Sequence, residues 1–203
     1  MNDKEKHLQD LAQIRSMMER SSRFLSLSGL SGIFAGIYAL IGAFVAFKML
    51  GLHIASTALK PYLLRGNIQG PEDFDLSFVF IPCVILIAAL GTGYFFTWRN
   101  AQKHDQKIWT KTSWLMLVNL FIPLAVGGLF SLIMIYHQIY FLLAASTLIF
   151  YGLALINASK YTLDEIRYLG ISEIVIGLLA AFFIDYGLLF WAIGFGVLHI
   201  FYL

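Results

Sequence analysis

The stretch from Thr112 to Ser159, TSWLMLVNLFIPLAVGGLFSLIMIYHQIYFLLAASTLIFYGLALINAS, decides the fold class. Its 48 residues include no Asp, Glu, Lys or Arg. One straight α-helix of that length would extend about 72 Å at about 1.5 Å per residue, whereas the hydrocarbon core of a bilayer is about 30 Å thick. The stretch therefore predicts two membrane-spanning helices, with the polar triplet at residues 136–138 in the turn between them.

Further apolar stretches lie on both sides of this one. Residues 24–47 and 76–98 carry no charged side chain, residues 168–184 carry only Glu173, and residues 186–203 complete a sixth stretch. Each is close to the roughly 20 residues that a spanning helix requires. We therefore predict an all-α polytopic membrane protein with six transmembrane helices arranged as three hairpins.

The composition supports a membrane protein over the other fold classes. Hydrophobic residues make up 59% of the chain and charged residues 13%, against about 45–50% and about 25% in soluble domains. The apolar runs are continuous and do not alternate with polar residues, which argues against a transmembrane β-barrel. The lipid bilayer is thus the first predicted partner, and a net charge of +2 gives no reason to expect nucleic acid.

The basic residues predict how the chain is oriented in the membrane. Eleven Lys and Arg fall in residues 1–23, 99–111 and 160–167, whereas the opposite side holds Lys48, Lys60 and Arg65. Loops rich in Lys and Arg stay in the cytoplasm. Both termini are therefore expected to be cytoplasmic.

The first 23 residues are expected to form a cytoplasmic amphipathic helix ahead of the transmembrane bundle at residues 24–203. Leu11, Ile14 and Met18 recur at helical spacing and form an apolar stripe. One interpretation is a docking helix for a cytoplasmic protein partner or for a second copy of the chain. The other is a helix that lies on the membrane surface.

Two segments of the chain resemble each other and predict an internal repeat. Residues 29–39, GLSGIFAGIYA, and residues 170–180, GISEIVIGLLA, are identical at five of eleven positions and exchange Leu and Ile at two more. Residues 89–93, ALGTG, likewise resemble residues 192–196, AIGFG. The first and third hairpins therefore read as parallel copies of one unit, in which helices 1–2 resemble helices 5–6.

Small residues recur along these segments at helical spacing. In lipid, small side chains let helix backbones approach closely, and van der Waals packing drives association. We therefore assign helix packing to Ser28, Gly32, Gly36, Gly177 and Ala181.

Three polar residues inside the apolar stretches are candidates for an intramembrane site. Glu173 lies about five residues into the fifth predicted helix, His199 about four residues from the end of the sixth, and Asn119 about six residues into the third. At similar depth they would converge on a polar pocket open to the cytoplasmic side. Such a pocket would bind a proton or a solute. Two alternatives are interhelical hydrogen bonding that fixes the packing, and a Glu173 that reaches Arg167 or the lipid headgroups.

The sequence lacks the motifs that would identify an enzyme. It contains no H-E-x-x-H, G-x-S-x-G, P-loop or C-x-x-C pattern, and its single cysteine, Cys83, lies in an apolar run. We therefore expect no catalytic residue, metal site or cofactor, and an intramembrane enzyme ranks behind the other function classes.

The segment IRSMME at residues 14–19, running into SGLSG at residues 28–32, resembles small uncharacterised multi-pass proteins of bacterial inner membranes. The resemblance implies a bacterial cytoplasmic membrane as the location, and implies no activity.

Two function classes lead. The favoured one is a regulatory or scaffold protein that engages a partner through its N-terminal helix, which predicts a closed bundle. The alternative is a small-solute or proton-coupled transporter, which predicts a cavity that reaches Glu173.

Overall fold

The computed structural model describes residues 29–49, 77–103 and 108–202. Every regular element in this part of the chain is helical. The long helices are α2 (Gly29–Met49), α4 (Ser77–Lys103), α5 (Lys111–Tyr136), α6 (Leu143–Ser159) and α7 (Asp164–Phe182). The sixth helical segment consists of α8 (Gly187–Trp191), the π-helix η4 (Ala192–Leu198) and α9 (His199–Tyr202), which follow one another without a break. We call it the C-terminal segment.

Five helical segments are long and apolar enough to cross a membrane: Gly29–Lys48, Phe80–Lys103, Lys111–Tyr136, Tyr140–Ser159 and Ile184–Tyr202. Helix α7 is the exception, because Asp164, Glu165, Arg167 and Glu173 all lie on its 19 residues. The turn expected at residues 136–138 is confirmed, since α5 ends at Tyr136. Gln138 there adopts a positive φ of 61°.

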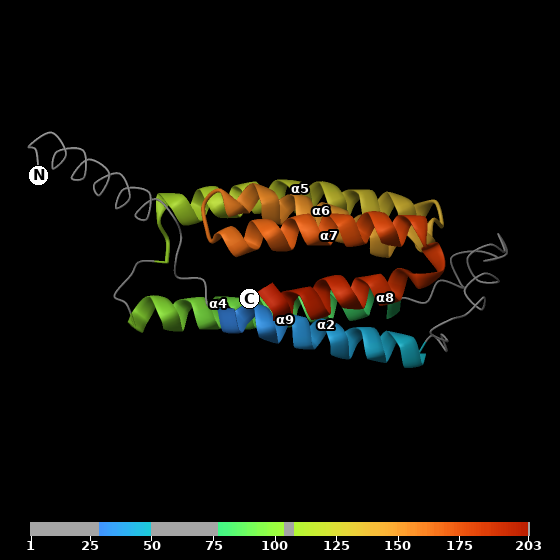
Figure 1. Cartoon of the computed structure of the whole chain (residues 1–203), viewed down its shortest axis with the longest axis horizontal. Helices are drawn as coiled ribbons and strands as arrows, with labels where there is room; N and C mark the ends of the chain where they lie inside the picture. Colours follow the sequence, from blue (N-terminus) through green and yellow to red (C-terminus); the bar gives the residue numbers. More distant parts are fainter. Residues whose placement is uncertain (1–28, 50–76, 104–107, 203) are drawn as a thin grey trace, which may run out of the picture.

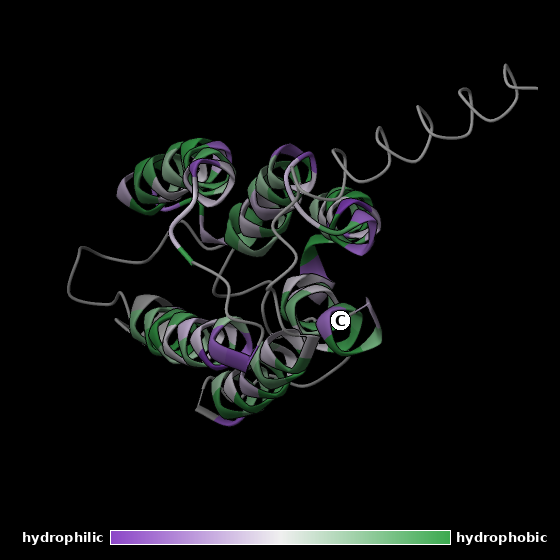
Figure 2. Cartoon of the chain, turned by 90° about the vertical axis from the view of Figure 1, so that its left-hand side faces the viewer, coloured by the Kyte–Doolittle hydropathy of each residue, from purple (hydrophilic) through white to green (hydrophobic). Residues whose placement is uncertain are grey.

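The helices form two layers of three (Figure 1). In one layer α6 lies between α5 and α7, and in the other α2 lies between α4 and the C-terminal segment. The view from the end of the bundle shows the same two groups (Figure 2). The layers meet where α7 and α6 pack against the C-terminal segment, so this interface joins the two halves of the molecule.

Glycines set the closest approaches between helices. A Cβ atom on Gly152 would lie 2.6 Å from the Gly170 carbonyl oxygen, so the α6 and α7 backbones touch there. Between α2 and the C-terminal segment, a Cβ on Gly36 would lie 2.7 Å from the Gly196 carbonyl oxygen. Small residues at helix crossings allow this kind of contact in membrane bundles.

The small residues assigned to packing follow this pattern where the structure describes them. Gly32, Gly36 and Gly177 are buried, and Gly177 faces α6. Ala181 is half-buried against an apolar cluster, and Ser28 lies outside the described residues. The internal repeat stays a prediction.

The outer faces of the bundle are apolar. Ile87 on α4 is 70% exposed and Phe121 on α5 is 69% exposed, and many other large apolar side chains are exposed around them. A soluble monomer rarely exposes such continuous apolar surface. Together with the length of the helices, this indicates a membrane protein.

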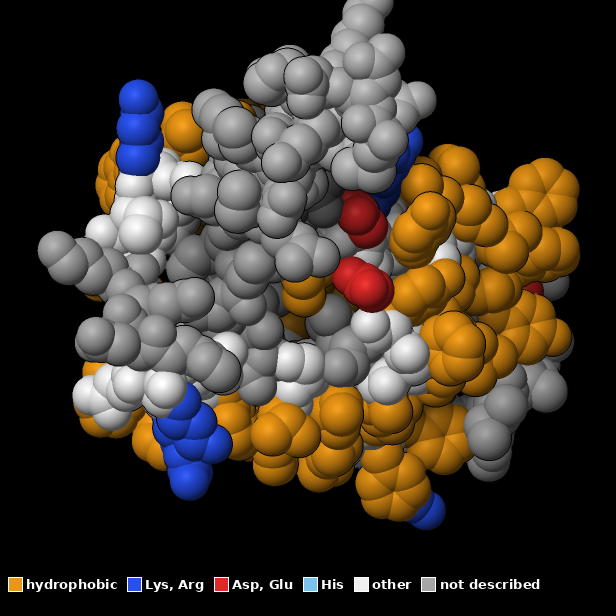
Figure 3. Space-filling view, turned by 60° about the vertical axis from the view of Figure 1, so that its left-hand side comes forward, with side chains coloured by type: hydrophobic (Ala, Val, Ile, Leu, Met, Phe, Trp, Pro, Cys, Tyr) orange, Lys and Arg blue, Asp and Glu red, His pale blue; other side chains and the backbone are white. Residues whose placement is uncertain are grey.

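Charged side chains gather at one end of the described bundle. The ends of α4 and α6 and the starts of α5 and α7 lie there. The basic residues at these four helix termini are Arg99, Lys103, Lys111, Lys160 and Arg167. Figure 3 shows basic side chains at this end, next to a broad apolar surface. The described part of the opposite end carries Lys48 and Asp185.

Candidate functional site

Glu173 lies at the midpoint of α7, nine residues from either end of the helix. That is about 14 Å from each end along the helix axis, deeper than the position expected from the start of the apolar run. Its side chain is 0% exposed and points toward α6 and the C-terminal segment. Its Oε1 lies 3.4 Å from His199 Nδ1 inside the bundle, so the alternative in which it reaches Arg167 or the headgroups is wrong.

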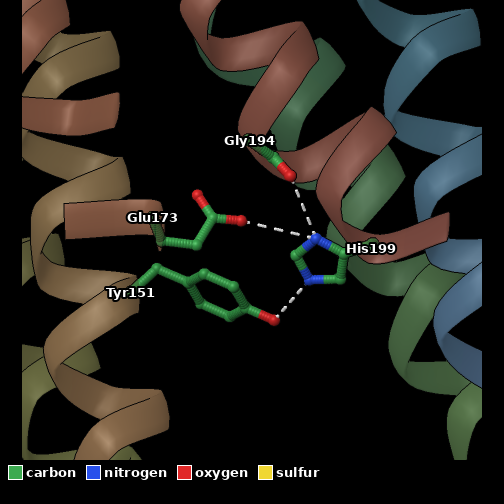
Figure 4. A network of polar contacts seen from close by, with 4 residues as sticks. All are labelled: Tyr151, Glu173, Gly194 and His199. Atoms are coloured by element: carbon green, nitrogen blue, oxygen red, sulfur yellow. Dashed lines mark hydrogen bonds and ion pairs between the residues drawn. The ribbon is translucent and has the colours of Figure 1, made fainter. Parts of the chain in front are cut away.

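His199 is the first residue of α9 and is 4% exposed. Its Nδ1 lies 3.2 Å from the Gly194 carbonyl oxygen and 3.4 Å from Glu173 Oε1. Its Nε2 lies 2.8 Å from the Tyr151 hydroxyl. Figure 4 shows this four-residue network, which joins α6 and α7 in one layer to the C-terminal segment in the other.

The partner of Nδ1 indicates where one proton of the imidazole lies. A carbonyl oxygen only accepts hydrogen bonds, so Nδ1 must carry the hydrogen that it shares with Gly194. In a neutral imidazole Nε2 then accepts, and the Tyr151 hydroxyl donates to it. The arrangement therefore fits a neutral His199 with its proton on Nδ1.

The carboxyl group of Glu173 has no hydrogen-bond partner on either oxygen within the described part of the chain. Its 3.4 Å distance to Nδ1 is longer than the roughly 2.7–2.9 Å of a charge-assisted hydrogen bond. Most buried polar groups in folded proteins are paired, and each exception needs an explanation. Glu173 is such an exception, because its two oxygens are buried and unpartnered.

Gly194 makes room for that carboxyl group. A Cβ atom at this position would lie 2.6 Å from Glu173 Oε2 and would also collide with the Leu148 side chain. Gly194 belongs to η4, whose turns are wider than those of an α-helix. Short π-helical segments are rare and often occur at functional sites. The glycine thus allows the C-terminal segment to contact the carboxyl group directly.

Apolar side chains surround the network. One buried cluster consists of Ala145, Leu148 and Ala180, and a second of Leu155, Ile166 and Leu169. The rings of Tyr151 and His199 stack with centroids 5.4 Å apart. The site is therefore closed in this conformation, whereas the sequence predicted a pocket open to the cytoplasmic side. A closed bundle was the expectation for a regulatory or scaffold protein, so a transporter would have to open the site in another conformation.

The structure brings together two of the three predicted site residues. Glu173 and His199 meet, but Asn119 does not join them, because its Nδ2 donates to the Leu115 carbonyl oxygen of its own helix. Tyr151 was not predicted. The available signal was a phenol in the middle of an uncharged stretch, since a buried hydroxyl usually finds a partner.

Leu11, Ile14 and Met18, the proposed docking stripe, lie outside the described residues.

Comparisons of the chain with protein-family models, with curated proteins and with solved structures found no match.

Proposed function

We propose that this protein is a proton-coupled membrane transporter of a small solute, with Glu173 as the group that binds the proton. The observation that carries the proposal is the carboxyl group itself, fully buried and without a hydrogen-bond partner on either oxygen among the residues that the structure describes. A residue retained only for packing would find partners. Ionisable groups kept inside a membrane bundle at such a cost are characteristic of ion and proton pathways.

The surroundings of Glu173 favour the neutral carboxylic acid in the closed conformation. A carboxylate at this place would have Oε2 against Gly194 and only His199 Nδ1, at 3.4 Å, near Oε1, and a poorly paired buried charge is very costly. Loss of the proton therefore requires that water reach the carboxyl group or that a donor move closer. Binding and release of the proton are in this way linked to opening and closing of the bundle.

The two layers are the parts that would move. Between the α5–α6–α7 layer and the α4–α2–C-terminal layer, the polar contacts of the site run from Tyr151 and Glu173 to His199. A displacement of one layer against the other would expose Glu173 first to one side of the membrane and then to the other. Rigid-body motion of this kind around a central site is a common way to achieve alternating access.

The transporter proposal implies six spanning helices, with α7 among them. The charges of α7 other than Glu173 lie in its first turn, where Asp164, Glu165 and Arg167 would reach the headgroups. The basic residues at that end of the bundle favour a cytoplasmic location for it. By the resemblance noted above, the membrane would be a bacterial cytoplasmic membrane.

Infrared difference spectroscopy on the protein in lipid nanodiscs tests the proposal. We expect a carboxylic-acid band that responds to pH in the wild-type protein and is absent from the Glu173→Gln variant. Glu165→Gln is the matched control, because this exposed carboxyl group lies on the same helix. A Glu173 that is ionised at every pH above the ordinary range for glutamate, about 4.3, would refute the proposal.

A regulatory or scaffold role through the N-terminal helix involves residues outside the described part of the chain and stays a prediction.

A further inference from the structure

We infer that Tyr151 is a positioning residue that holds His199 as the neutral tautomer with its proton on Nδ1, so that the exchangeable proton of the site stays on Glu173. The inference deepens the proposed function and rests on it for the role of Glu173. The tautomer of His199 can be measured independently of any transport activity.

On one side of the ring, Nδ1 donates a hydrogen bond to the Gly194 carbonyl oxygen. The Gly194 carbonyl oxygen at 3.2 Å and Glu173 Oε1 at 3.4 Å both face this nitrogen. The carbonyl accepts hydrogen bonds only, so removing the Nδ1 hydrogen would bring two lone pairs together. The hydrogen therefore stays on Nδ1 whether Glu173 is neutral or ionised.

On the other side of the ring, Nε2 accepts a hydrogen bond that the Tyr151 hydroxyl donates. The hydroxyl lies 2.8 Å from Nε2 and has no other hydrogen-bond partner in the described part of the protein. If Nε2 took up a proton, it would become a donor, and the Tyr151 hydroxyl hydrogen would need a new acceptor. A buried donor without an acceptor is costly. Tyr151 thus opposes formation of the imidazolium.

The remaining groups around Glu173 leave the carboxyl group as the proton carrier. The titratable side chains that face it are Tyr151 from α6 and His199 from α9. The α8 and η4 sequences, GLLFW and AIGFGVL, contain no ionisable residue. When Glu173 releases its proton to water, the O–H bond breaks and the electron pair remains on the carboxylate. His199 then donates Nδ1–H to that carboxylate without changing its own proton count.

This assignment gives the histidine a defined task. It acts as a fixed donor that stabilises the ionised carboxyl group once the proton has left, and it does not compete for the proton. Without Tyr151, both Glu173 and His199 would be able to take up a proton. The site would then titrate in two steps.

Nitrogen-15 NMR of histidine-labelled protein in nanodiscs tests the inference. The chain contains five histidines, so the His199→Gln variant identifies the His199 signals. In the wild type at neutral pH we expect a protonated Nδ1 and an unprotonated Nε2. A proton on Nε2, in either the other tautomer or an imidazolium, would overturn the inference, and this measurement needs no Tyr151 variant.

The Tyr151→Phe variant adds the causal test. We expect the equilibrium between protonated and unprotonated Nε2 to shift toward protonation by about fivefold, the ratio that one ordinary hydrogen bond produces. Tyr202→Phe is the matched control, because its hydroxyl also makes a contact between α9 and the other layer, 3.1 Å from Ser172 Oγ on α7. An unchanged Nε2 in Tyr151→Phe would refute the positioning role.

The infrared measurement separates the two proposals. If His199 shows the expected tautomer while Glu173 fails to respond to pH, the proposed function is wrong and the positioning of His199 stands. If Glu173 responds to pH but His199 is protonated on Nε2, the function stands and the inference fails.

Discussion

Replacing Glu173 with methionine should make the bundle more stable, although it should abolish the proposed activity. Methionine has a similar length and flexibility and brings no polar atom into the space beside Gly194. Both carboxyl oxygens of Glu173 are buried without a hydrogen-bond partner in residues 29–49, 77–103 and 108–202. The substitution therefore removes the desolvation cost of the carboxyl group and breaks no hydrogen bond. His199 keeps its bond to the Gly194 carbonyl oxygen and is not left unpaired.

The expected change in the free energy of unfolding follows from the surroundings of Glu173. An unsatisfied buried polar group costs about 1–3 kcal/mol. A change in the shape of a core side chain at constant volume usually costs less than about 1.5 kcal/mol. Glutamate and methionine have similar helix propensities, so α7 itself is not affected. The net expectation is an increase of about 1–2 kcal/mol in the free energy of unfolding.

Reversible unfolding in mixed micelles, followed by circular dichroism, measures this difference. Glu165→Met is the control on the same helix. That carboxyl group is exposed in the first turn of α7, and its removal should lower stability by about 0.3–1 kcal/mol through the helix dipole. A loss of stability in Glu173→Met would refute the reasoning, because it would mean that the carboxyl group holds the fold together.

Three further predictions concern packing and the limits of the site. Gly127→Ala should destabilise the protein by about 1–3 kcal/mol, because the new methyl group would collide with Phe150; its neighbour Gly128 has open space, so Gly128→Ala should be neutral or stabilise by up to about 1 kcal/mol. Thermal unfolding of the two variants side by side checks this pair, and equal effects would contradict the assigned α5–α6 contact. Gly194→Ala should shift the infrared band of the buried carboxyl group, since its methyl group would lie 2.6 Å from a carboxyl oxygen; an unchanged band would show that the carboxyl does not contact this glycine. Asn119→Ala should leave both that band and its pH response unchanged, because this amide bonds only within its own helix.

Local properties of the sequence predicted the helices well. The uncharged run at residues 112–159 was divided correctly at residues 136–138, because its length exceeds one membrane thickness and its polar triplet breaks the apolar pattern. Helix ends were less certain. Helix α4 continues to Lys103 and α7 begins at Asp164, since charged residues form helical turns as readily as apolar ones do.

The site was only half predictable. Glu173 and His199 were identifiable because an ionisable group in an apolar run is expensive wherever the helix packs. Asn119 met the same criterion but is satisfied by the Leu115 carbonyl oxygen one turn away. Hydrogen bonding within a helix leaves no trace in the spacing of residues along the sequence.

The sequence alone determined that the chain forms apolar helices, where they turn and that a carboxyl group lies inside one of them. Only the tertiary structure decided which faces of the helices meet. In a membrane bundle both the lipid-facing and the protein-facing sides are apolar, so hydropathy does not distinguish them. The two layers, the stacking of Tyr151 on His199 and the contact of Glu173 with Gly194 all depend on rotations and crossings of the helices. Those are set by close packing between segments far apart in the sequence, 48 residues apart for Tyr151 and His199 and farther still for Gly36 and Gly196.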